Sequence, residues 1–387
     1  MITPYANRHD LQTFNFQLSI FNLIRMTIRI FNPEHDIALA SNMERFTAPH
    51  AGRQLRSDLG YLPAFWADEG DVVIVDDIDF AESAYRRAKA ERKPKVEFCT
   101  MEQIAHVLSS SAIAPDIDLW GWDLAIRFQL AKAGVPEESL PSKDAIQELR
   151  RLSGRQCTTD ILKKVRNGIE SNTCGESTYY VDYDLFLNAI QSKKVVVKAP
   201  WSSSGRGVRY FIEEELPKNS LNWASNVIQQ QGGVMVEPLY NKVKDFGMEF
   251  RRCADGSVRY LGLSLFQTLN GAYTGNVLAT ENVKREMMSK YVSLELLDEV
   301  TARLERELAA LFSSLPSEKA LENIYFGVDM MIVAREDADG FLLHPCVEIN
   351  LRRTMGHVAL ALSPMDDTKE GAMAINYESK RYHLRLK

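Results

Sequence analysis

The residues with the clearest chemical potential lie in two apolar segments near the end of the chain. Asp329 stands in the first segment, and Glu348 and Asn350 stand two residues apart in the second. A polar turn between the segments predicts a β-hairpin, and side chains two apart on a strand project from the same face. Paired strands would bring Asp329 opposite the other two. Mg²⁺ prefers such carboxylate and amide oxygens, with substrate phosphates completing its shell.

An arginine follows this group closely. Arg352 lies two residues after Asn350, where it could grip a transferring phosphoryl group through paired hydrogen bonds. The alternative is an exposed hairpin with polar residues at its outward positions. Glu348 and Asn350 lie in an otherwise apolar strand, where unpaired polar groups are unfavourable, and this favours a metal site.

A lysine at the end of a β-prone strand precedes a loop rich in serine and glycine. The lysine is Lys198, and the loop contains Ser203, Ser204, Gly205 and Gly207. Glycine lets backbone N–H groups turn toward an anion, the hydroxyls add donors, and the lysine supplies a point charge for a phosphate. Taken alone, such a loop is equally typical of a hairpin turn. Its glycine spacing is neither that of a Walker loop nor that of a dinucleotide-binding fingerprint.

A third candidate follows the next strand-like run. Glu237 and the backbone near Leu239 form an edge that could read an adenine amino group. Further on, Glu249 or Asp245 offers a carboxylate for ribose hydroxyls. Taken separately, each of these pieces is more typical of an ordinary strand end and turn.

The order of the pieces resembles the ATP-grasp superfamily over roughly residues 142–357. The specific part is Glu348-Ile-Asn350-Leu-Arg352 after Asp329. The resemblance implies that Asp329, Glu348 and Asn350 hold two Mg²⁺ ions and that Arg352 acts on the γ-phosphoryl group. The remaining implied nucleotide ligands are Lys143 and Lys198 for the phosphates, the 202–207 loop as their cover, Glu237 and Leu239 for adenine, and Glu249 or Asp245 for ribose.

Two features depart from the family pattern. The stretch between Glu237 and Glu249 is longer than in the D-alanine ligase type, which leaves the ribose contact open between Glu249 and Asp245. Lys143 is followed by an arginine-rich helix over 150–155, so either Lys143 or one of these arginines would be the second phosphate-binding cation.

The resemblance implies an ATP- and Mg²⁺-dependent ligase. A small-molecule or peptide carboxylate would be activated as an acyl phosphate, and an amine or thiol would then displace phosphate. One alternative is a kinase on the same scaffold that phosphorylates a small-molecule hydroxyl. Another is a non-catalytic nucleotide-binding module, whose mark would be the loss of a magnesium ligand or of the strand lysine; the sequence retains all of them.

The elements that must position these residues predict an α/β fold, with α+β character in the grasp part. Strand-like runs at 28–31, 71–75 and 95–99 alternate with helical stretches, which favours a parallel sheet. We expect a Rossmann-like pre-ATP-grasp domain over 26–140, which would contribute the substrate, and a two-lobed ATP-grasp fold after it. The expected small lobe spans 141–236 and the large lobe 237–387.

Smaller features complete this plan. Met26 is expected to be the working start, with residues 1–25 as a dispensable extension. His35 or Asp36, after the first strand, could contact the nucleophile, although a polar turn is an equal interpretation. Ser142 would cap one helix, a second would span 293–314, and an apolar strand over 372–376 would complete a sheet or pair between subunits, leaving an oligomer possible.

Composition sets the outer limits. The chain has 387 residues, a net charge of −6 and 45% hydrophobic residues, which excludes a largely disordered protein. The acidic balance argues against general nucleic-acid binding, which needs a basic face. The apolar stretch near the start is broken by polar residues, so we expect no membrane span. Five cysteines without a C-x-x-C pair favour reduced, mostly buried thiols and a cytoplasmic protein.

Overall fold

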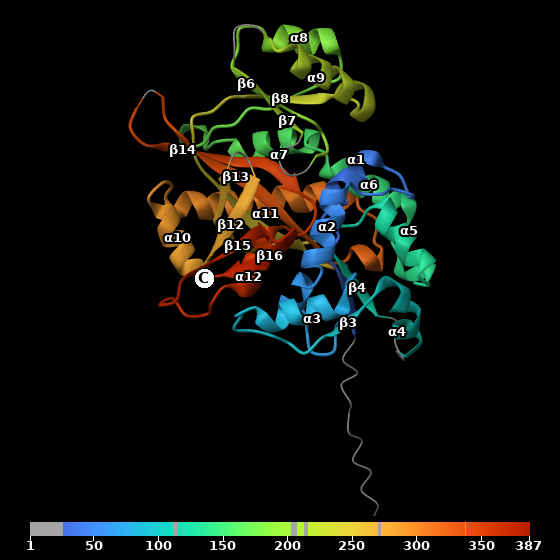
Figure 1. Cartoon of the computed structure of the whole chain (residues 1–387). Helices are drawn as coiled ribbons and strands as arrows, with labels where there is room; N and C mark the ends of the chain where they lie inside the picture. Colours follow the sequence, from blue (N-terminus) through green and yellow to red (C-terminus); the bar gives the residue numbers. More distant parts are fainter. Residues whose placement is uncertain (1–25, 111–114, 203–206, 213–215, 270–271, 337) are drawn as a thin grey trace, which may run out of the picture.

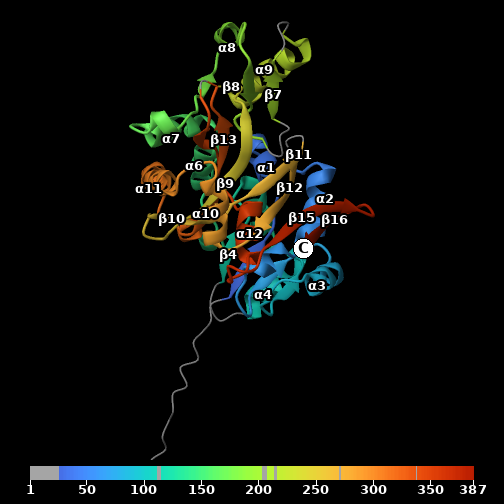
Figure 2. The same ribbon diagram turned by 90° about the vertical axis from the view of Figure 1, so that its left-hand side faces the viewer.

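The computed structural model describes residues 26–387 except 111–114, 203–206, 213–215, 270–271 and 337 (Figure 1). The predicted loop residues Ser203, Ser204 and Gly205 and the predicted extension 1–25 lie outside the described residues. In the described part, the strands form four sheets of four strands each. Figures 1 and 2 show one of these sheets at the top of the molecule with two helices, α8 and α9, beside it.

The N-terminal part is built on a parallel sheet with the strand order β3-β2-β1-β4. Its strands are β1 (Thr27–Ile30), β2 (Val72–Ile74), β3 (Glu97–Cys99) and β4 (Asp116–Leu119). Five helices accompany it, namely α1 (His35–Ser41), α2 (His50–Leu59), α3 (Ile78–Arg87), α4 (Ile104–Ser110) and α5 (Leu124–Lys132). The predicted parallel sheet is confirmed. Because β2 and β4 flank β1 on opposite sides, the strand order reverses between β1 and β4, which is where open sheets bind ligands.

Two helices connect this sheet to the rest of the chain. They are α6 (Lys143–Ser153) and α7 (Gln156–Arg166). The Ser142 hydroxyl accepts a hydrogen bond from the Ala145 amide at 3.1 Å, which confirms the predicted helix cap. The apolar faces of both helices belong to the largest hydrophobic cluster, together with the central sheet and the N-terminal sheet.

The segment predicted to form the small lobe contains most of the sheet β5-β8-β6-β7, and a hydrophobic cluster lies there around Phe186, Phe211 and Ala224. Its elements are β5 (Thr178–Tyr180), α8 (Tyr183–Ile190), β6 (Val195–Lys198), β7 (Val208–Phe211), α9 (Lys218–Gln231) and β8 (Val234–Pro238). The antiparallel pairing of β6 with β8 sets Lys198 opposite Met235 and Val196 opposite Glu237. This register brings the predicted phosphate lysine close to the predicted adenine edge.

The central sheet has the order β10-β9-β13-β14. Its strands are β9 (Lys242–Arg252), β10 (Val258–Ser264), β13 (Ile324–Ala334) and β14 (Phe341–Asn350), and the nearby helices are α10 (Glu281–Ser289) and α11 (Leu294–Leu311). The predicted hairpin is confirmed, because β13 and β14 pair in antiparallel fashion. The predicted long helix is also confirmed. Its buried stripe consists of Leu297, Val300, Leu304 and Leu308.

The fourth sheet has the order β11-β12-β15-β16. It contains β11 (Phe266–Leu269), β12 (Ala272–Leu278), β15 (Gly371–Glu378) and β16 (Arg381–Leu386), and α12 (Met355–Leu362) packs against β12. The predicted C-terminal strand therefore completes a sheet within the chain, as the first of its two alternatives required.

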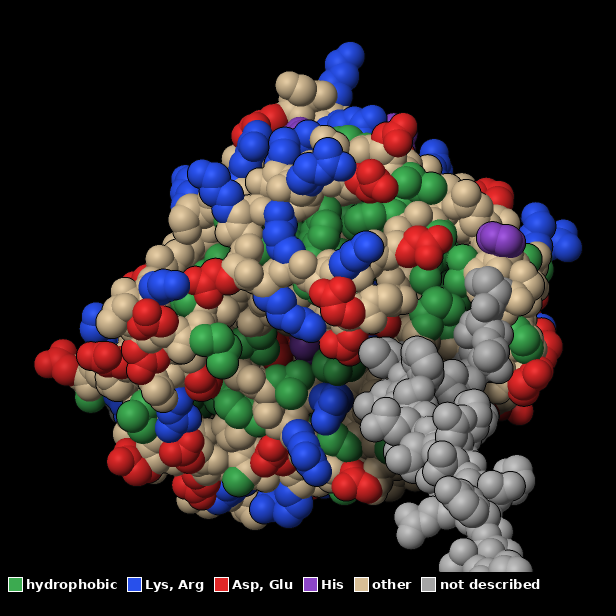
Figure 3. Space-filling view, turned by 90° about the horizontal axis from the view of Figure 1, so that it is seen from below, with side chains coloured by type: hydrophobic (Ala, Val, Ile, Leu, Met, Phe, Trp, Pro, Cys, Tyr) green, Lys and Arg blue, Asp and Glu red, His purple; other side chains and the backbone are tan. Residues whose placement is uncertain are grey.

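The surface carries charges of both signs. On the face seen in Figure 3, Lys and Arg side chains are interspersed with Asp and Glu side chains. No helix in the described part of the chain combines the length and the apolar character needed to cross a bilayer. Four of the five cysteines are buried and all five are free thiols, as the sequence predicted; Cys157 is the partly exposed one.

Candidate functional site

Neighbouring strands of the central sheet place the acidic residues of the hairpin beside a third acid. Two rows of paired residues cross β9, β13 and β14, namely Glu249–Gly327–Asn350 and Gly247–Asp329–Glu348. The rows are two residues apart on each strand, so their side chains share one face of the sheet. We call Glu249, Asp329 and Glu348, with the Asn350 amide, the carboxylate cluster.

Asp329 lies at the centre of the carboxylate cluster. The Asn350 side-chain amide donates a hydrogen bond to Asp329 Oδ2 at 3.0 Å. Burial raises the pKa of Asp329 to about 7, and the charges of Glu348 and Glu249 add to this effect. A nearby cation would stabilise the ionised form of this carboxyl group and lower its pKa.

Glu249 is 3% exposed and approaches the cluster from β9. Its Oε2 lies 2.9 Å from His357 Nδ1, but that nitrogen accepts the amide N–H of Thr354. Glu249 Oε2 is therefore a buried oxygen without a hydrogen-bond donor among the described residues. A Cβ on Gly356 would lie 1.8 Å from Glu249 Oε1, so residue 356 must be glycine for the carboxylate to fit. Glu249 thus lies beside Asp329, deep in the sheet.

The cluster fits a hard divalent cation. A Cβ on Gly247 would lie 3.7 Å from both Asp329 Oδ1 and Glu249 Oε1, so the two carboxylates flank one point above β9. In the part of the chain that the structure describes, no three His, Cys, Asp or Glu side chains form a complete cage. Mg²⁺ does not need one, because it usually takes one or two carboxylates together with water and phosphate. A bound cation would give the unpartnered oxygen of Glu249 a ligand, and it would stabilise the ionised form of Asp329.

Two cations of this part of the site, Lys198 and Arg155, come from β6 and from the residue before α7. Lys198 is buried, and its Nζ lies 2.6 Å from Glu237 Oε2. Arg155 donates to Glu348 Oε1 at 2.6 Å, to the Ala199 carbonyl at 2.6 Å and to Ser202 Oγ at 2.7 Å. An arginine of the predicted arginine-rich segment therefore lies between the lysine strand and the hairpin.

Lys143 lies elsewhere. It is the first residue of α6, its side chain is 60% exposed, and it forms an ion pair with Glu44. Trp201, which follows Lys198 by three residues, contacts Arg150 and Ser153 at the opposite end of α6. An eleven-residue helix is about 15 Å long. The structure thus brings Arg155, and not Lys143, to Lys198's end of the site.

The predicted loop is pinned where its described ends meet. The Ala199 amide donates to the Gly207 carbonyl at 2.8 Å. A Cβ on Gly207 would lie 2.2 Å from the Ser202 side chain, so this close approach requires glycine.

At the predicted adenine edge, the Leu239 amide donates to the Lys194 carbonyl at 3.0 Å. Asp245, the second ribose candidate, lies 2.6 Å from Lys242. The ribose contact stays a prediction.

Arg352 is fixed by a residue from the N-terminal sheet. Its Nε and Nη2 donate to the Asp36 carboxylate at 2.8–3.0 Å, and Nη2 also donates to Asn350 Oδ1 at 3.1 Å. Burial would raise the pKa of Asp36, but the Arg352 guanidinium outweighs it and holds that pKa below its ordinary value. The proposed phosphoryl-binding arginine therefore adjoins the loop after β1.

That loop lies at the point where the strand order of the N-terminal sheet reverses. His35 Nδ1 lies 3.2 Å from Asp123 Oδ2, and the Asn32 amide donates to the Gly121 carbonyl at 2.8 Å. Asp123 also caps α5 by accepting from the Ile126 amide. The interpretation of 32–36 as part of a substrate site gains support from its contact with Arg352. Asp123 is a residue that the sequence analysis did not select as a site residue, and its signal was its place at a strand end before a helix. Arg155 was one of the alternatives to Lys143 that the sequence left open.

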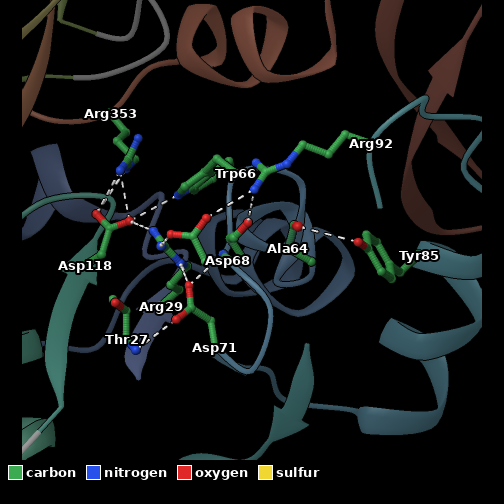
Figure 4. A network of polar contacts seen from close by, with 11 residues as sticks. Thr27, Arg29, Ala64, Trp66, Asp68, Asp71, Tyr85, Arg92, Asp118 and Arg353 are labelled. Atoms are coloured by element: carbon green, nitrogen blue, oxygen red, sulfur yellow. Dashed lines mark hydrogen bonds and ion pairs between the residues drawn. The ribbon is translucent and has the colours of Figure 1, made fainter. Parts of the chain in front are cut away.

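A buried ionic network holds the neighbouring residue Arg353 (Figure 4). Arg353 lies 2.8 Å from Asp118, and Arg29 bridges Asp118 at 2.5 Å and Asp71 at 2.7 Å. The Arg353 guanidinium also lies 3.6 Å from the centre of the Tyr325 ring. These contacts join β4 of the N-terminal sheet to the central sheet directly after Arg352, and so they fix the two parts of the site against each other.

Two surface hollows lie away from this site. One, of about 520 Å³, lies between α7 and α11. The other, of about 420 Å³, lies near Ser142 and Glu318. Neither is lined by a residue of the carboxylate cluster, and much of each lining consists of ion-paired side chains.

Comparisons with known proteins find similarity through structure alone. No protein-family model matches the chain, and no curated protein matches it. N5-carboxyaminoimidazole synthetase from Staphylococcus aureus, complexed with ADP, aligns over 92% of this chain and 84% of its own, with 12% identity and a TM-score of 0.44. A putative ATP-grasp superfamily protein from Archaeoglobus fulgidus aligns over 93% and 98%, with 16% identity and a TM-score of 0.42. Biotin carboxylase from Campylobacter jejuni, in a β,γ-ATP complex, aligns over 91% and 76%, with 10% identity and a TM-score of 0.48. One of these three structures is described as a putative ATP-grasp superfamily protein, and all three align with most of this chain at 10–16% identity.

Proposed function

We propose that the protein is an ATP- and Mg²⁺-dependent ligase of the ATP-grasp type. It activates a substrate carboxylate as an acyl phosphate, which an amine or thiol then attacks. The observation that carries this proposal is the ion pair of 2.6 Å between Arg155 and Glu348. It brings a cation at the base of the Ser/Gly loop to a carboxylate of the hairpin, so that groups suited to phosphate and groups suited to a metal meet at one place.

The nucleotide phosphates are bound by Lys198, Arg155 and the 202–207 loop in this proposal. Lys198 supplies a compact charge, whereas the planar guanidinium of Arg155 suits bidentate contact with phosphate oxygens. Glu237 and the hinge near Leu239 face adenine in this proposal. The ion pair of 2.6 Å between Glu237 and Lys198 places this adenine side next to the phosphate-binding lysine. A loop closed over the phosphates would exclude the water that hydrolyses an acyl phosphate.

The magnesium site consists of Asp329, Glu348 and Asn350, with Glu249 beside them. Bound Mg²⁺ would neutralise charge on the β- and γ-phosphoryl oxygens. The ionised carboxylates would hold the metal ion in place. Glu249 is buried, and electrostatic interactions are stronger in such a poorly hydrated environment than in water.

The reaction has two steps. A carboxylate oxygen of the substrate attacks the γ-phosphorus, the bond from that phosphorus to the β–γ bridging oxygen breaks, and ADP leaves. The amine nitrogen or thiol sulfur then attacks the acyl carbon, phosphate leaves with the electrons of the C–O bond, and the nucleophile releases its proton. Arg352, oriented by Asp36 at 2.8–3.0 Å, stabilises the phosphoryl oxygens in both steps. The substrate enters beside the start of α1, which follows β1 and contains Asp36.

Trapping with hydroxylamine tests this reaction. Pools of carboxylic acids are incubated with ATP, Mg²⁺ and hydroxylamine, and hydroxamate, ADP and free phosphate are measured. We expect one pool to give hydroxamate and ADP in equal amounts, and we expect none with the Glu348→Gln variant. A stable phosphorylated hydroxyl compound without free phosphate would instead identify a kinase.

A further inference from the structure

An imidazole without hydrogen bonds lies on β14, close to the proposed nucleotide site. His344 is 1% exposed, and neither ring nitrogen has a hydrogen-bond partner among the described residues. Buried polar groups are rarely left unpaired, because the lost hydration is not recovered. An imidazole with both nitrogens free therefore indicates a missing ligand. The mechanism proposed above does not use this side chain.

The surroundings of His344 suit a flat heterocycle. The Tyr240 ring meets the imidazole edge-on with its centre 5.7 Å away. A Cβ on Gly175 would lie 2.7 Å from His344 Nε2, and the φ of +124° at Gly175 is one that glycine tolerates. An apolar cluster adjoins these rings; it consists of Cys174, Met331 and Val333, with Tyr240, Leu342 and Val347 packed against it. The side chains around His344 are thus aromatic and apolar, the types that predominate in the lining of small-ligand sites.

The other polar groups at this end of the site are already engaged. The Leu239 amide donates to the Lys194 carbonyl at 3.0 Å, and Glu237 Oε2 is paired with Lys198 Nζ at 2.6 Å. These were the two groups that the sequence placed against adenine. Tyr240, the next residue after Leu239, carries the contact from this hinge to His344. The imidazole is thus an unpartnered polar group that contacts this hinge through Tyr240.

We propose that His344 reads the purine ring of the nucleotide, an inference that rests on the proposed ATP site. A neutral imidazole offers one N–H donor and one acceptor nitrogen. Adenine presents the complementary pair, an amino donor and ring-nitrogen acceptors. His344 therefore acts as a specificity-determining residue, while Lys198 and Arg155 bind the phosphates, which every nucleotide shares.

The charge state of His344 agrees with this role. The pKa of His344 is lowered to about 3, mainly by burial and in smaller part by the cations Lys198 and Arg166. The ring is therefore neutral at neutral pH and keeps one donor and one acceptor.

The test compares ligands with and without a base. Dissociation constants with saturating Mg²⁺ are measured by calorimetry for ADP, 7-deaza-ADP, the 6-deamino analogue of ADP, and tripolyphosphate. The proteins are wild type, His344→Phe, which keeps an aromatic ring, and His344→Gln, which keeps a donor and an acceptor. His344→Met replaces the Phe variant if that one does not fold.

We expect the Phe variant to bind ADP about tenfold more weakly, the loss of roughly one hydrogen bond. The Gln variant should recover most of this affinity. At least one of the two base analogues should bind wild type and Phe variant equally, because the bond it lacks is the one that His344 makes. Tripolyphosphate, which has no base, should bind all variants alike.

The inference is wrong if the Phe or Met variant binds ADP as tightly as wild type does. It is also wrong if tripolyphosphate loses as much affinity as ADP, since the damage would then reach the phosphate site. Failure of wild type to bind any of these ligands would instead overturn the proposed ATP site, so the two failures are distinguishable.

Discussion

Arg155 Nη2 and Glu348 Oε1 lie 2.6 Å apart and hold together two groups that the proposed reaction needs separately. The arginine side chain is 7% exposed and the glutamate side chain is 23% exposed, so the pair is poorly screened by water. When Mg²⁺ engages Glu348 and phosphate engages Arg155, this pair must exchange partners. Binding of Mg²⁺ would therefore raise the affinity for the nucleotide, and binding of the nucleotide would raise the affinity for Mg²⁺, in addition to the effect of their direct contact.

The first prediction concerns nucleotide binding without metal. In a chelator, Glu348→Gln should bind ADP about tenfold more tightly than wild type, because Arg155 is freed from an anionic partner (~1.4 kcal/mol). Calorimetric titration with ADP in excess EDTA measures this difference. The gain from added Mg²⁺ should be smaller in the variant than in wild type.

The matched control for this prediction is Asp329→Asn. Well above the Asp329 pKa of about 7, where Asp329 is ionised, this variant removes the same charge from the carboxylate cluster. The hydrogen-bond partner of Asp329 is the neutral Asn350 amide, so no cation is released. An equal gain in metal-free ADP affinity for both variants would show that the loss of negative charge alone is responsible. That outcome would contradict the exchange of partners.

Lys198 and Glu237 form a second buried pair, and its two halves can be separated by mutation. Lys198→Met leaves the Glu237 carboxylate buried and unpaired, and we expect a loss of about 3–5 kcal/mol in unfolding free energy. Adding Glu237→Gln should recover much of that stability without restoring ADP binding. Urea unfolding and ADP titration of the single and double variants separate these effects. Restored ADP binding in the double variant would show that Lys198 has no role at the phosphates.

Asp36 is expected to orient Arg352 without binding the nucleotide. Asp36→Asn weakens the bidentate grip, so turnover of the carboxylate found by hydroxamate trapping should fall about a hundredfold, as small misplacements can cost. The dissociation constant of Mg²⁺·ADP should stay within about threefold of wild type. A parallel loss of ADP affinity and turnover would assign Asp36 to the general stability of the site instead.

The strand pairing of the hairpin could be predicted from the sequence because its determinants are local. Asp329, Glu348 and Asn350 lie on two adjacent strands whose apolar runs and polar turn specify the pairing. The helix cap at Ser142 is also a local signal, and its hydroxyl accepts the expected amide hydrogen bond. Ser293, where the second predicted helix was expected to begin, caps that helix in the same way. In each case a few neighbouring residues determine the geometry.

The remaining contacts depend on pairings that are distant in sequence. Asp36 and Arg352 are 316 residues apart, and no local pattern joins them. Glu249 reaches the carboxylate cluster because β9 pairs with β13 in a particular register, which the packing of the whole sheet selects. Arg155, and not Lys143, lies near Lys198 because of the direction of α6. Lys143 is the first residue of that helix, and Arg155 follows its last turn.

The network around Asp118 gives a prediction about pH. Burial would raise the pKa of Asp118, but the charges of Arg353 and Arg29 outweigh it and lower that pKa. A lowered pKa in the folded state contributes stability above the unfolded value, about 3.9, and this contribution is lost as the pH falls below it. Asp118→Asn should therefore be about 3 kcal/mol less stable than wild type at neutral pH.

The stability gap between wild type and Asp118→Asn should close as the pH falls. Urea unfolding of both proteins at about pH 7 and about pH 3 measures this gap. A gap that stays constant over this range would show that Asp118 contributes through packing and not through its charge.

The most direct test of the account is a thermal-shift titration with ATP and Mg²⁺ on wild type and Glu348→Gln. A ligand that binds only the folded state stabilises it by about 2.7 kcal/mol at a hundredfold excess over its dissociation constant. We expect the melting temperature of wild type to rise with ATP and to rise further with Mg²⁺, and we expect the Mg²⁺-dependent part to shrink in the variant. No shift of wild type with any nucleotide at saturating Mg²⁺ would contradict the proposed ATP site.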